Sequence, residues 1–285
     1  MNNFRSLLVN FLSNTIGKLL IIVRPAKAKK LAKDGMTVVL DDSDLSILDR
    51  LMRRALLKKI EAKGDFEQLA KLHGNYWKNK GDIFFDKNNN HLEQINLPFC
   101  DFIFPLLKEE LSKQKEKYST LVEIGTGNGR VLDYLSTEFK DIDNFIGIDL
   151  SDIQTQNNNK YYKKNNKLKF ITSDAFDWVE KYGKENTIFL TFMGVLEYFT
   201  EQRLQNFLSR ISGLGNVVFV AIEPNGYNHD FSKNPHSQIY GSERSFSHNY
   251  HLLFKNSGFQ LWHTSKKKLK NNRDYISFIG AINHK

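Results

Sequence analysis

Cysteine and proline are scarce in this chain, which has a single cysteine, Cys100, and 5 prolines among 285 residues. One thiol cannot form an internal disulfide or supply the paired cysteines of a zinc ribbon. The hydrophobic content of 40% is typical of a globular protein with room for one large domain and an appendage. We therefore expect a folded protein in a reducing, cytoplasmic compartment.

The chain also lacks a long uninterrupted apolar run. Residues 4–23 are rich in apolar side chains, but polar residues interrupt them every few positions, which argues against a transmembrane span. The segment that follows is basic and has no run of small residues, so it does not resemble the cleavage site of a signal peptide.

Acidic side chains are absent from residues 1–33, which carry seven basic ones. Residues 1–80 hold 16 Lys/Arg and 8 Asp/Glu, a net charge of +8. Residues 81–285 hold 25 and 24, a net charge of +1. The basic isoelectric point thus describes the N-terminal part of the chain and not the whole surface.

Residues 4–23 show helical periodicity, with apolar side chains on one side and mostly polar ones on the other. Two interpretations stay open for this basic region, residues 4–33. It is an interfacial anchor on the inner face of a membrane, or its helix packs on its own domain or on a second subunit of an oligomer.

The next segment, residues 36–115, is predicted to be a helical lead-in. Asp42 or Ser43 is the expected N-cap of a helix that ends near Gly64, and further helices are expected at 66–77 and 101–117, with a loop at 86–91. We therefore divide the chain into residues 1–35, 36–115 and 116–285.

Seven short apolar runs follow, and the first five are separated by stretches that suit helices. They lie at 121–124, 144–148, 169–172, 187–191, 217–222, 259–263 and 276–282. Such alternation predicts an α/β fold, Rossmann-like and doubly wound, with a mostly parallel seven-stranded sheet. Residues 266–273 are too short for a helical crossover, so one of the last two strands is expected to be antiparallel.

A glycine-rich turn connects the first strand to the next helix, with Glu123 followed by Gly125, Gly127 and Gly129. Glycine permits the sharp turn and the close approach of a ligand to the backbone. The spacing differs from the dinucleotide fingerprint because position 130 is Arg, and no Lys-Ser/Thr follows, which excludes a P-loop.

This acidic-x-Gly-x-Gly-x-Gly pattern resembles the first motif of the class I S-adenosylmethionine-dependent methyltransferases, and the resemblance extends over residues 116–285. Asp149 ends the second strand, where a carboxylate can accept hydrogen bonds from the ribose hydroxyls. The resemblance implies that Asp174 lies against the adenine amino group and that the turn at 193–199 supports the methionine end. The implied S-adenosylmethionine-binding residues are Glu123, Gly125, Thr126, Gly127, Gly129, Asp149, Leu150, Asp174, Ala175 and Met193.

A hydroxyl acceptor benefits from a general base, and loops at the carboxyl ends of the strands build the site in such folds. His248 is the first candidate, at the start of an expected helix ending at Gly258, and His236 the second; for each, an ordinary surface or capping role is the alternative. Glu197 is a further candidate to contact the substrate. The histidines lack metal-ligand spacing, so we expect transfer without a metal.

The acceptor is predicted to be a hydroxyl on a small molecule or a saccharide, including a lipid-linked or envelope glycan. The Asp/Asn-Pro-Pro-Tyr turn of amide and base methylases is absent, since residues 193–196 read Met-Gly-Val-Leu. The lysine-rich stretches at 160–164 and 266–270 are interpreted as solvated surface, which argues against nucleic acid. An RNA or protein methyltransferase, and a non-catalytic module that binds a nucleoside or a partner, remain alternatives.

Overall fold

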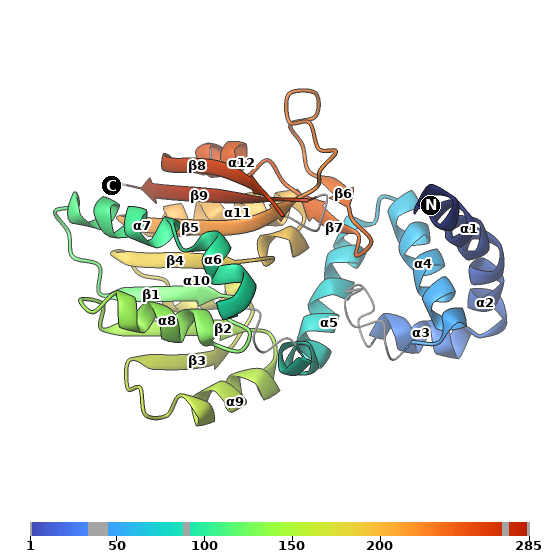
Figure 1. Ribbon diagram of the computed structural model, residues 1–285, viewed down its shortest axis with the longest axis horizontal. Coiled ribbons are helices and arrows are strands. Elements are labelled where there is room, and N and C mark those ends of the chain that lie inside the picture. The colour runs from blue at the N-terminus through green and yellow to red at the C-terminus, as the bar shows by residue number, and fades with distance from the viewer. Residues whose placement is uncertain (1, 34–44, 88–91, 270–273, 284–285) are drawn as a thin grey trace. The chain divides into compact units, whose positions relative to one another are not determined.

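The computed structural model describes residues 2–33, 45–87, 92–269 and 274–283. They form two compact units (Figure 1). Unit 1 consists of residues 1–80 and 241–245, and unit 2 of residues 81–240 and 246–285. The helix over 66–87 contributes to both units. The division of the chain at 35 and 115 stays a prediction.

Unit 1 is helical. Its elements are α1 (Asn2–Leu12), a π-helical turn η1 (Ser13–Gly17), α2 (Lys18–Val23), α3 (Pro25–Lys33), α4 (Ile47–Ala62) and the first part of α5 (Phe66–Lys87). The helix predicted over 4–23 is therefore present, with a π turn at its centre. The N-cap of α4 is Ser46, whose hydroxyl accepts a hydrogen bond from the Asp49 amide at 3.2 Å. The predicted caps Asp42 and Ser43 lie outside the described residues.

The α1–α2 segment packs on α4 through its small side chains. Ser13 and Gly17 are buried, and a Cβ atom on Gly17 would lie 2.5 Å from the Leu51 carbonyl oxygen. The predicted apolar stripe faces elsewhere: of its members, Phe11 and Leu19 are exposed and Leu20 alone is fully buried among the residues whose side chains are described. The helix thus packs within its unit through a close contact at a glycine, and most of its large apolar side chains stay outside that contact.

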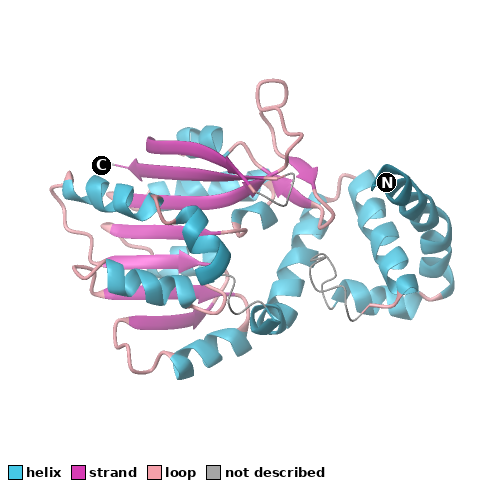
Figure 2. Ribbon diagram, viewed as in Figure 1, coloured by secondary structure: helices cyan, strands magenta, loops and turns pink. Residues whose placement is uncertain are grey.

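Unit 2 contains the predicted sheet. Its strands are β1 (Thr120–Ile124), β2 (Asn144–Asp149), β3 (Leu168–Thr172), β4 (Thr187–Phe192), β5 (Val217–Asn225), β8 (Gln260–Lys268) and β9 (Tyr275–Asn283), in the order β3-β2-β1-β4-β5-β9-β8 (Figure 2). Strands β1 to β5 pair in parallel, and β9 runs antiparallel to both β5 and β8. The Rossmann-like fold and the antiparallel strand are confirmed.

Alternate residues along each central strand enter two apolar cores. On β5, Val218 and Val220 face one core and Phe219 the other. The first core is covered by α6 (Leu97–Cys100), α7 (Ile103–Ser112) and α8 (Arg130–Glu138), and the second by α10 (Ala175–Tyr182), α11 (Glu201–Ser212) and α12 (Tyr250–Asn256) (Figure 1). Because both faces are covered, the central strands are apolar on both sides.

Some predicted boundaries are wrong. Residues 266–268, expected in a loop, extend β8, and α5 runs to Lys87 through the start of the loop expected at 86–91. Of the helix predicted over 101–117, α7 occupies residues 103–112, and the π turn η3 (Leu92–Asn96) and α6 that precede it were not predicted. The short pair β6 (Gln238–Tyr240) and β7 (Ser245–Ser247) was not predicted, since three-residue strands carry too little periodicity.

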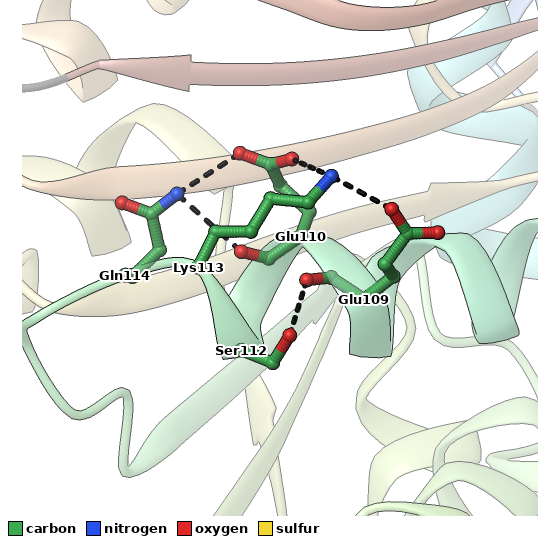
Figure 3. Close-up of polar contacts among 5 residues, drawn as sticks. All are labelled: Glu109, Glu110, Ser112, Lys113 and Gln114. Carbon is green, nitrogen blue, oxygen red and sulfur yellow. Dashed lines mark hydrogen bonds and ion pairs between the residues drawn. The ribbon is translucent and has the colours of Figure 1, made fainter.

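Helix α7 ends at Ser112, and side chains near this end bind one another and helix carbonyl groups (Figure 3). The Ser112 hydroxyl donates to the Glu109 carbonyl at 2.7 Å, and Gln114 Nε2 donates to the Glu110 carboxylate at 2.9 Å. Lys113 Nζ lies 2.8 Å from Glu109 Oε1 and 3.4 Å from Glu110 Oε2. The Ser112 hydroxyl thus satisfies a carbonyl group at the helix end, while Lys113 and Gln114 join the side chains around it. The chain then turns toward β1.

The close packing of Gly17 against Leu51 predicts that a side chain at this position lowers stability. Replacing Gly17 with Ala should lower the free energy of unfolding by about 1–3 kcal/mol, since the methyl group meets backbone that cannot move aside easily. Urea titration followed by circular dichroism measures this. The exposed Asn14→Ala, in the same turn, is the control and should be close to neutral. A Gly17→Ala variant as stable as the control would contradict the packing.

Candidate functional site

The carboxyl ends of the parallel strands β1, β2, β4 and β5 lie at one edge of the sheet, and the glycine turn begins there. Gly125, Gly127 and Gly129 have φ values of +70°, +51° and +75°. Side chains with a Cβ atom rarely adopt this left-handed region, which explains three glycines within five residues. Gly129 then starts α8.

The glycine loop, residues 125–129, is held by hydrogen bonds from its neighbours. The amides of Gly125 and Thr126 donate to the Ile148 carbonyl at 2.8 and 3.0 Å. From α9 (Asp152–Tyr161), Asn158 Nδ2 donates to the Gly127 carbonyl at 2.7 Å. The hydroxyl of Tyr162 donates to the Asn128 carbonyl at 3.1 Å. These bonds fix the direction in which the loop amides point.

Asn158 is itself positioned from within α9. Its side chain is buried, and its Oδ1 accepts a hydrogen bond from Gln154 Nε2 at 2.8 Å. This pair could not be predicted from the sequence, because α9 is rich in Asn and Gln along its whole length and no single residue is distinctive. The single signal available was the helical spacing of four residues between the two amides.

The backbone of the glycine loop offers the close approach that a bound nucleoside needs. A Cβ atom on Gly127 would lie 2.2 Å from the ring of Phe85, and one on Gly129 would lie 2.7 Å from the ring of Phe170. Aromatic rings therefore already use the space that the missing side chains leave. A side chain at either position would overlap these rings, so both positions require glycine. The close approach to the backbone that a glycine turn permits fits a nucleoside-containing cofactor.

Asp149, at the end of β2, is half-buried beside this loop. Its Oδ2 accepts a hydrogen bond from the Gly127 amide and its Oδ1 one from the Ser151 amide, both at 2.9 Å. Burial raises the pKa of this carboxyl, and the amides of Ser151, Gly127 and Leu150 oppose that rise. The structure thus brings Asp149, Leu150 and the glycines together, as predicted; that Asp149 binds the ribose stays a prediction.

Glu123 lies under the loop and not in it. Its carboxylate is buried and accepts a hydrogen bond from the Thr126 hydroxyl at 2.7 Å. Burial, helped by the charge of Asp149, raises the pKa of Glu123 to about 8. Its structural role is therefore to support Thr126 from below the turn.

Asp174, after β3, is the N-cap of α10 and accepts a hydrogen bond from the Phe176 amide at 2.9 Å. Its other oxygen pairs with Arg203 Nη2 of α11 at 2.6 Å. Ala175 is buried next to it. The resemblance implied a contact between Asp174 and the adenine amino group. That contact stays a prediction, and Arg203 is a partner that the sequence did not indicate.

The turn after β4 contains two residues with positive φ, Met193 at +59°, which is strained because it has a Cβ atom, and Gly194 at +109°. The Met193 amide donates to the Ile222 carbonyl of β5 at 2.7 Å. Glu223 holds the following turn, since its buried Oε2 accepts hydrogen bonds from the amides of Val195 and Leu196 at 3.0 and 3.1 Å. Burial raises the pKa of Glu223 to about 7. Glu223 was not among the residues predicted for the site.

Glu197 lies at the same turn. It is 7% exposed, and a Cβ atom on Gly194 would lie 2.7 Å from its Oε1. Its Oε2 accepts a hydrogen bond from the hydroxyl of Tyr240 in β6. The turn therefore presents a carboxylate beside a phenol at the carboxyl edge of the sheet.

The two candidate histidines are placed differently. His248 is fully buried just before Asn249, the N-cap of α12; its Nδ1 lies 2.6 Å from the Ser237 hydroxyl and its Nε2 lies 3.1 Å from the Leu196 carbonyl. Burial lowers the pKa of His248 to about 4. His236 has a side chain 77% exposed and pairs with Glu201 at 3.0 Å. Both ring nitrogens of His248 are thus engaged within the fold.

Among the described residues, no group of three His, Cys, Asp or Glu side chains is arranged to hold a metal ion. Transfer without a metal therefore stays a prediction for the whole chain.

Comparison with known proteins identifies the domain that carries this site. Residues 121–214 match the family described as a methyltransferase domain. A search of the curated proteins found no match.

Several solved structures are similar at low identity. One is magnesium protoporphyrin IX methyltransferase from Synechocystis PCC 6803 with bound S-adenosylmethionine, at 11% identity over 90% of this chain and 97% of that chain, with a TM-score of 0.45. Another is the N-methyltransferase NodS from Bradyrhizobium japonicum WM9, at 12% identity over 68% of this chain and 91% of that chain, with a TM-score of 0.47. A third is geranyl diphosphate C-methyltransferase from Streptomyces coelicolor A3(2), at 13% identity over 63% and 79%, with a TM-score of 0.46. Likeness at this level does not indicate an acceptor.

The hydrogen bond from Asn158 to the Gly127 carbonyl predicts that α9 contributes to the affinity for S-adenosylhomocysteine. Asn158→Ala should weaken binding by about tenfold, the loss expected for one buried hydrogen bond. Isothermal calorimetry measures the affinity. The matched control is Asn157→Ala, one residue away and exposed, which should bind like the wild type. Equal affinities for the two variants would show that the loop does not depend on α9.

The Glu123 carboxyl predicts a pH dependence of stability. Its pKa is about 8 in the folded state against 4.5 for the free group, so the folded state keeps the proton between these values and the unfolded state releases it. The contribution of Glu123 to stability therefore falls as pH rises through this window. Near pH 8, Glu123→Gln should be more stable than the wild type by at least about 1.4 kcal/mol, the equivalent of one pKa unit.

Urea titrations at pH 5 and pH 8 compare the two proteins. The exposed Glu185→Gln is the control and should show no such gain at pH 8. A Glu123→Gln variant that loses stability equally at both pH values would contradict the predicted protonation.

Proposed function

We propose that this chain transfers a methyl group from S-adenosylmethionine to a hydroxyl of a small molecule or a glycan. The methyltransferase domain at residues 121–214 supports its assignment as a class I S-adenosylmethionine-dependent methyltransferase. When bound, S-adenosylmethionine supplies a methyl group on a positively charged sulfur. Gly125, Gly127, Asp149 and the turn at Met193 are the residues that would hold it. Their common edge of the sheet is where ligands bind in open α/β folds.

The pair formed by Glu197 and Tyr240 is the observation that supports a hydroxyl as the methyl acceptor. A hydroxyl is a weak nucleophile until a base takes its proton, and a carboxylate next to the reacting group can do so. Glu197 is largely shielded from water, and the Tyr240 hydroxyl orients it. In this proposal Glu197 accepts the proton, and Tyr240 is a positioning residue.

The alternative bases are less well suited. His248 uses both ring nitrogens within the fold, one at the Ser237 hydroxyl and the other at the Leu196 carbonyl. His236 is exposed and engaged with Glu201 on the surface. Of the three predicted candidates, Glu197 is therefore the one whose surroundings support a role in catalysis.

A pair of aromatic rings supports a saccharide or another flat polyhydroxylated acceptor. Tyr227, just after β5, stacks on Tyr275 of β9 with ring centroids 5.9 Å apart and an interplanar angle of 4°. Tyr227 is 48% exposed, and Lys268 Nζ lies 5.2 Å from the centre of its ring. Such rings offer an apolar face with polar groups at its rim.

The lysines within residues 266–270 give little support to RNA as the methyl acceptor. Lys266 Nζ lies 3.6 Å from the centre of the Phe231 ring, and Lys267 Nζ lies 3.6 Å from that of Phe102. Lys267 also donates to the Phe99 carbonyl at 3.0 Å. These ammonium groups are therefore turned onto aromatic rings, and the near-neutral residues 81–285 offer no excess of positive charge for a phosphate backbone.

Methyl transfer from labelled S-adenosylmethionine to a panel of hydroxylated metabolites, oligosaccharides, RNA and protein tests the proposal. Glu197→Gln should slow transfer to a hydroxyl acceptor by about a hundredfold or more while leaving S-adenosylhomocysteine affinity unchanged. Glu201→Gln, which alters a neighbouring surface carboxylate, is the control and should retain the rate. Labelling of RNA or protein with no labelling of hydroxyl acceptors would overturn the proposal.

A further inference from the structure

Large apolar side chains of unit 1 stay exposed along residues 7–23. Leu7, Phe11, Leu19 and Ile22 are 67%, 63%, 58% and 74% exposed. Leu8, Ile16 and Val23 are exposed as well. Single exposed apolar residues are common on protein surfaces, but seven within 17 residues of one helical segment mark an interaction surface.

The segment is exposed even though it is packed within its unit. Ser13, Gly17 and Leu20 are buried, and the contact of Gly17 with Leu51 fixes which side of the helix meets α4. The side chains with the largest apolar area are therefore those that the unit leaves outside. An apolar stripe of this size would normally face the core of the unit that contains it.

Cations surround this stripe, and acidic groups are absent from the same stretch. Lys18 and Arg24 are exposed within or next to α2. In α3, Ala28 and Leu31 are buried while Lys29, Lys30 and Lys33 are exposed. Residues 1–33 contain no Asp or Glu. The patch thus combines apolar area with a net positive charge.

We propose that unit 1 docks on an anionic lipid surface through residues 7–33. The apolar side chains would enter the boundary between headgroups and acyl chains, and the lysines would meet anionic headgroups. A second copy of the chain is a poorer occupant, because apposed copies would bring like charges together. This surface is independent of the acceptor proposed above.

The geometry favours a segment that lies on the lipid rather than one that crosses it. None of the described helices is long and apolar enough to cross a membrane alone. Leu7–Val23 and Pro25–Lys33 reach that length and composition only as a pair, bent by 103°. Both helices also bury one side within the unit, which leaves the opposite side for the headgroup region.

Co-sedimentation of the full chain with phosphatidylcholine vesicles, with and without phosphatidylglycerol, tests the proposal. Binding should require phosphatidylglycerol and weaken with added salt. The double variant Leu19→Ser/Ile22→Ser and the double variant Lys29→Glu/Lys30→Glu should each lower the partition coefficient by about tenfold or more. All variants should bind S-adenosylhomocysteine like the wild type, which separates this test from that of the enzyme activity.

Matched controls come from exposed residues of unit 2. Ile153→Ser removes an apolar side chain that is 55% exposed, and Lys163→Glu/Lys164→Glu reverses two exposed lysines. Both should bind vesicles like the wild type. Absence of binding to anionic vesicles, or equal binding to neutral ones, would overturn the proposal. Light scattering gives a further result that would overturn it: the wild type is a dimer, the Leu19→Ser/Ile22→Ser variant is a monomer, and neither binds vesicles.

Discussion

At the end of β1 the backbone turns sharply through three glycines, and hydrogen bonds from two neighbouring elements determine where its amides point. The Ile148 carbonyl and the Asp149 carboxylate of β2 bind amides of the loop, while Asn158 of α9 binds its Gly127 carbonyl. The central parallel strands bring these groups to one edge. The cofactor site therefore depends on the register between β1 and β2, which pairs Ile124 with Ile148.

Carboxyl groups kept out of water support the same edge. Glu123 and Glu223 are both buried, with pKa values raised to about 8 and about 7, and each binds a turn that follows a strand. Glu123 binds Thr126 after β1, and Glu223 binds the amides after β4. Burying a carboxyl group costs stability unless hydrogen bonds offset it, and here those bonds shape the turns after β1 and β4. Part of the folding stability is therefore lost in order to hold these turns in shape.

The sheet could be predicted from the sequence because short apolar runs, the glycine turn and strand-end acids are local signals. Asp149 and the glycines were placed together correctly for that reason. Contacts made by side chains far apart in the sequence could not be predicted, as Arg203 with Asp174 and Tyr240 with Glu197 illustrate. The face through which α1–α2 packs could not be predicted either, because hydrophobicity ranks large residues as core while the packing uses Ser13 and Gly17. The acceptor is not encoded in any local motif.

The central claim is that residues 121–214 bind S-adenosylmethionine through the glycine loop and Asp149. Isothermal calorimetry with S-adenosylmethionine and S-adenosylhomocysteine, run on the wild type and on Asp149→Ala, tests it most directly. The account predicts micromolar binding of both ligands by the wild type and clearly weaker binding by the variant. Absence of binding by the wild type, or equal binding by both proteins, would contradict it.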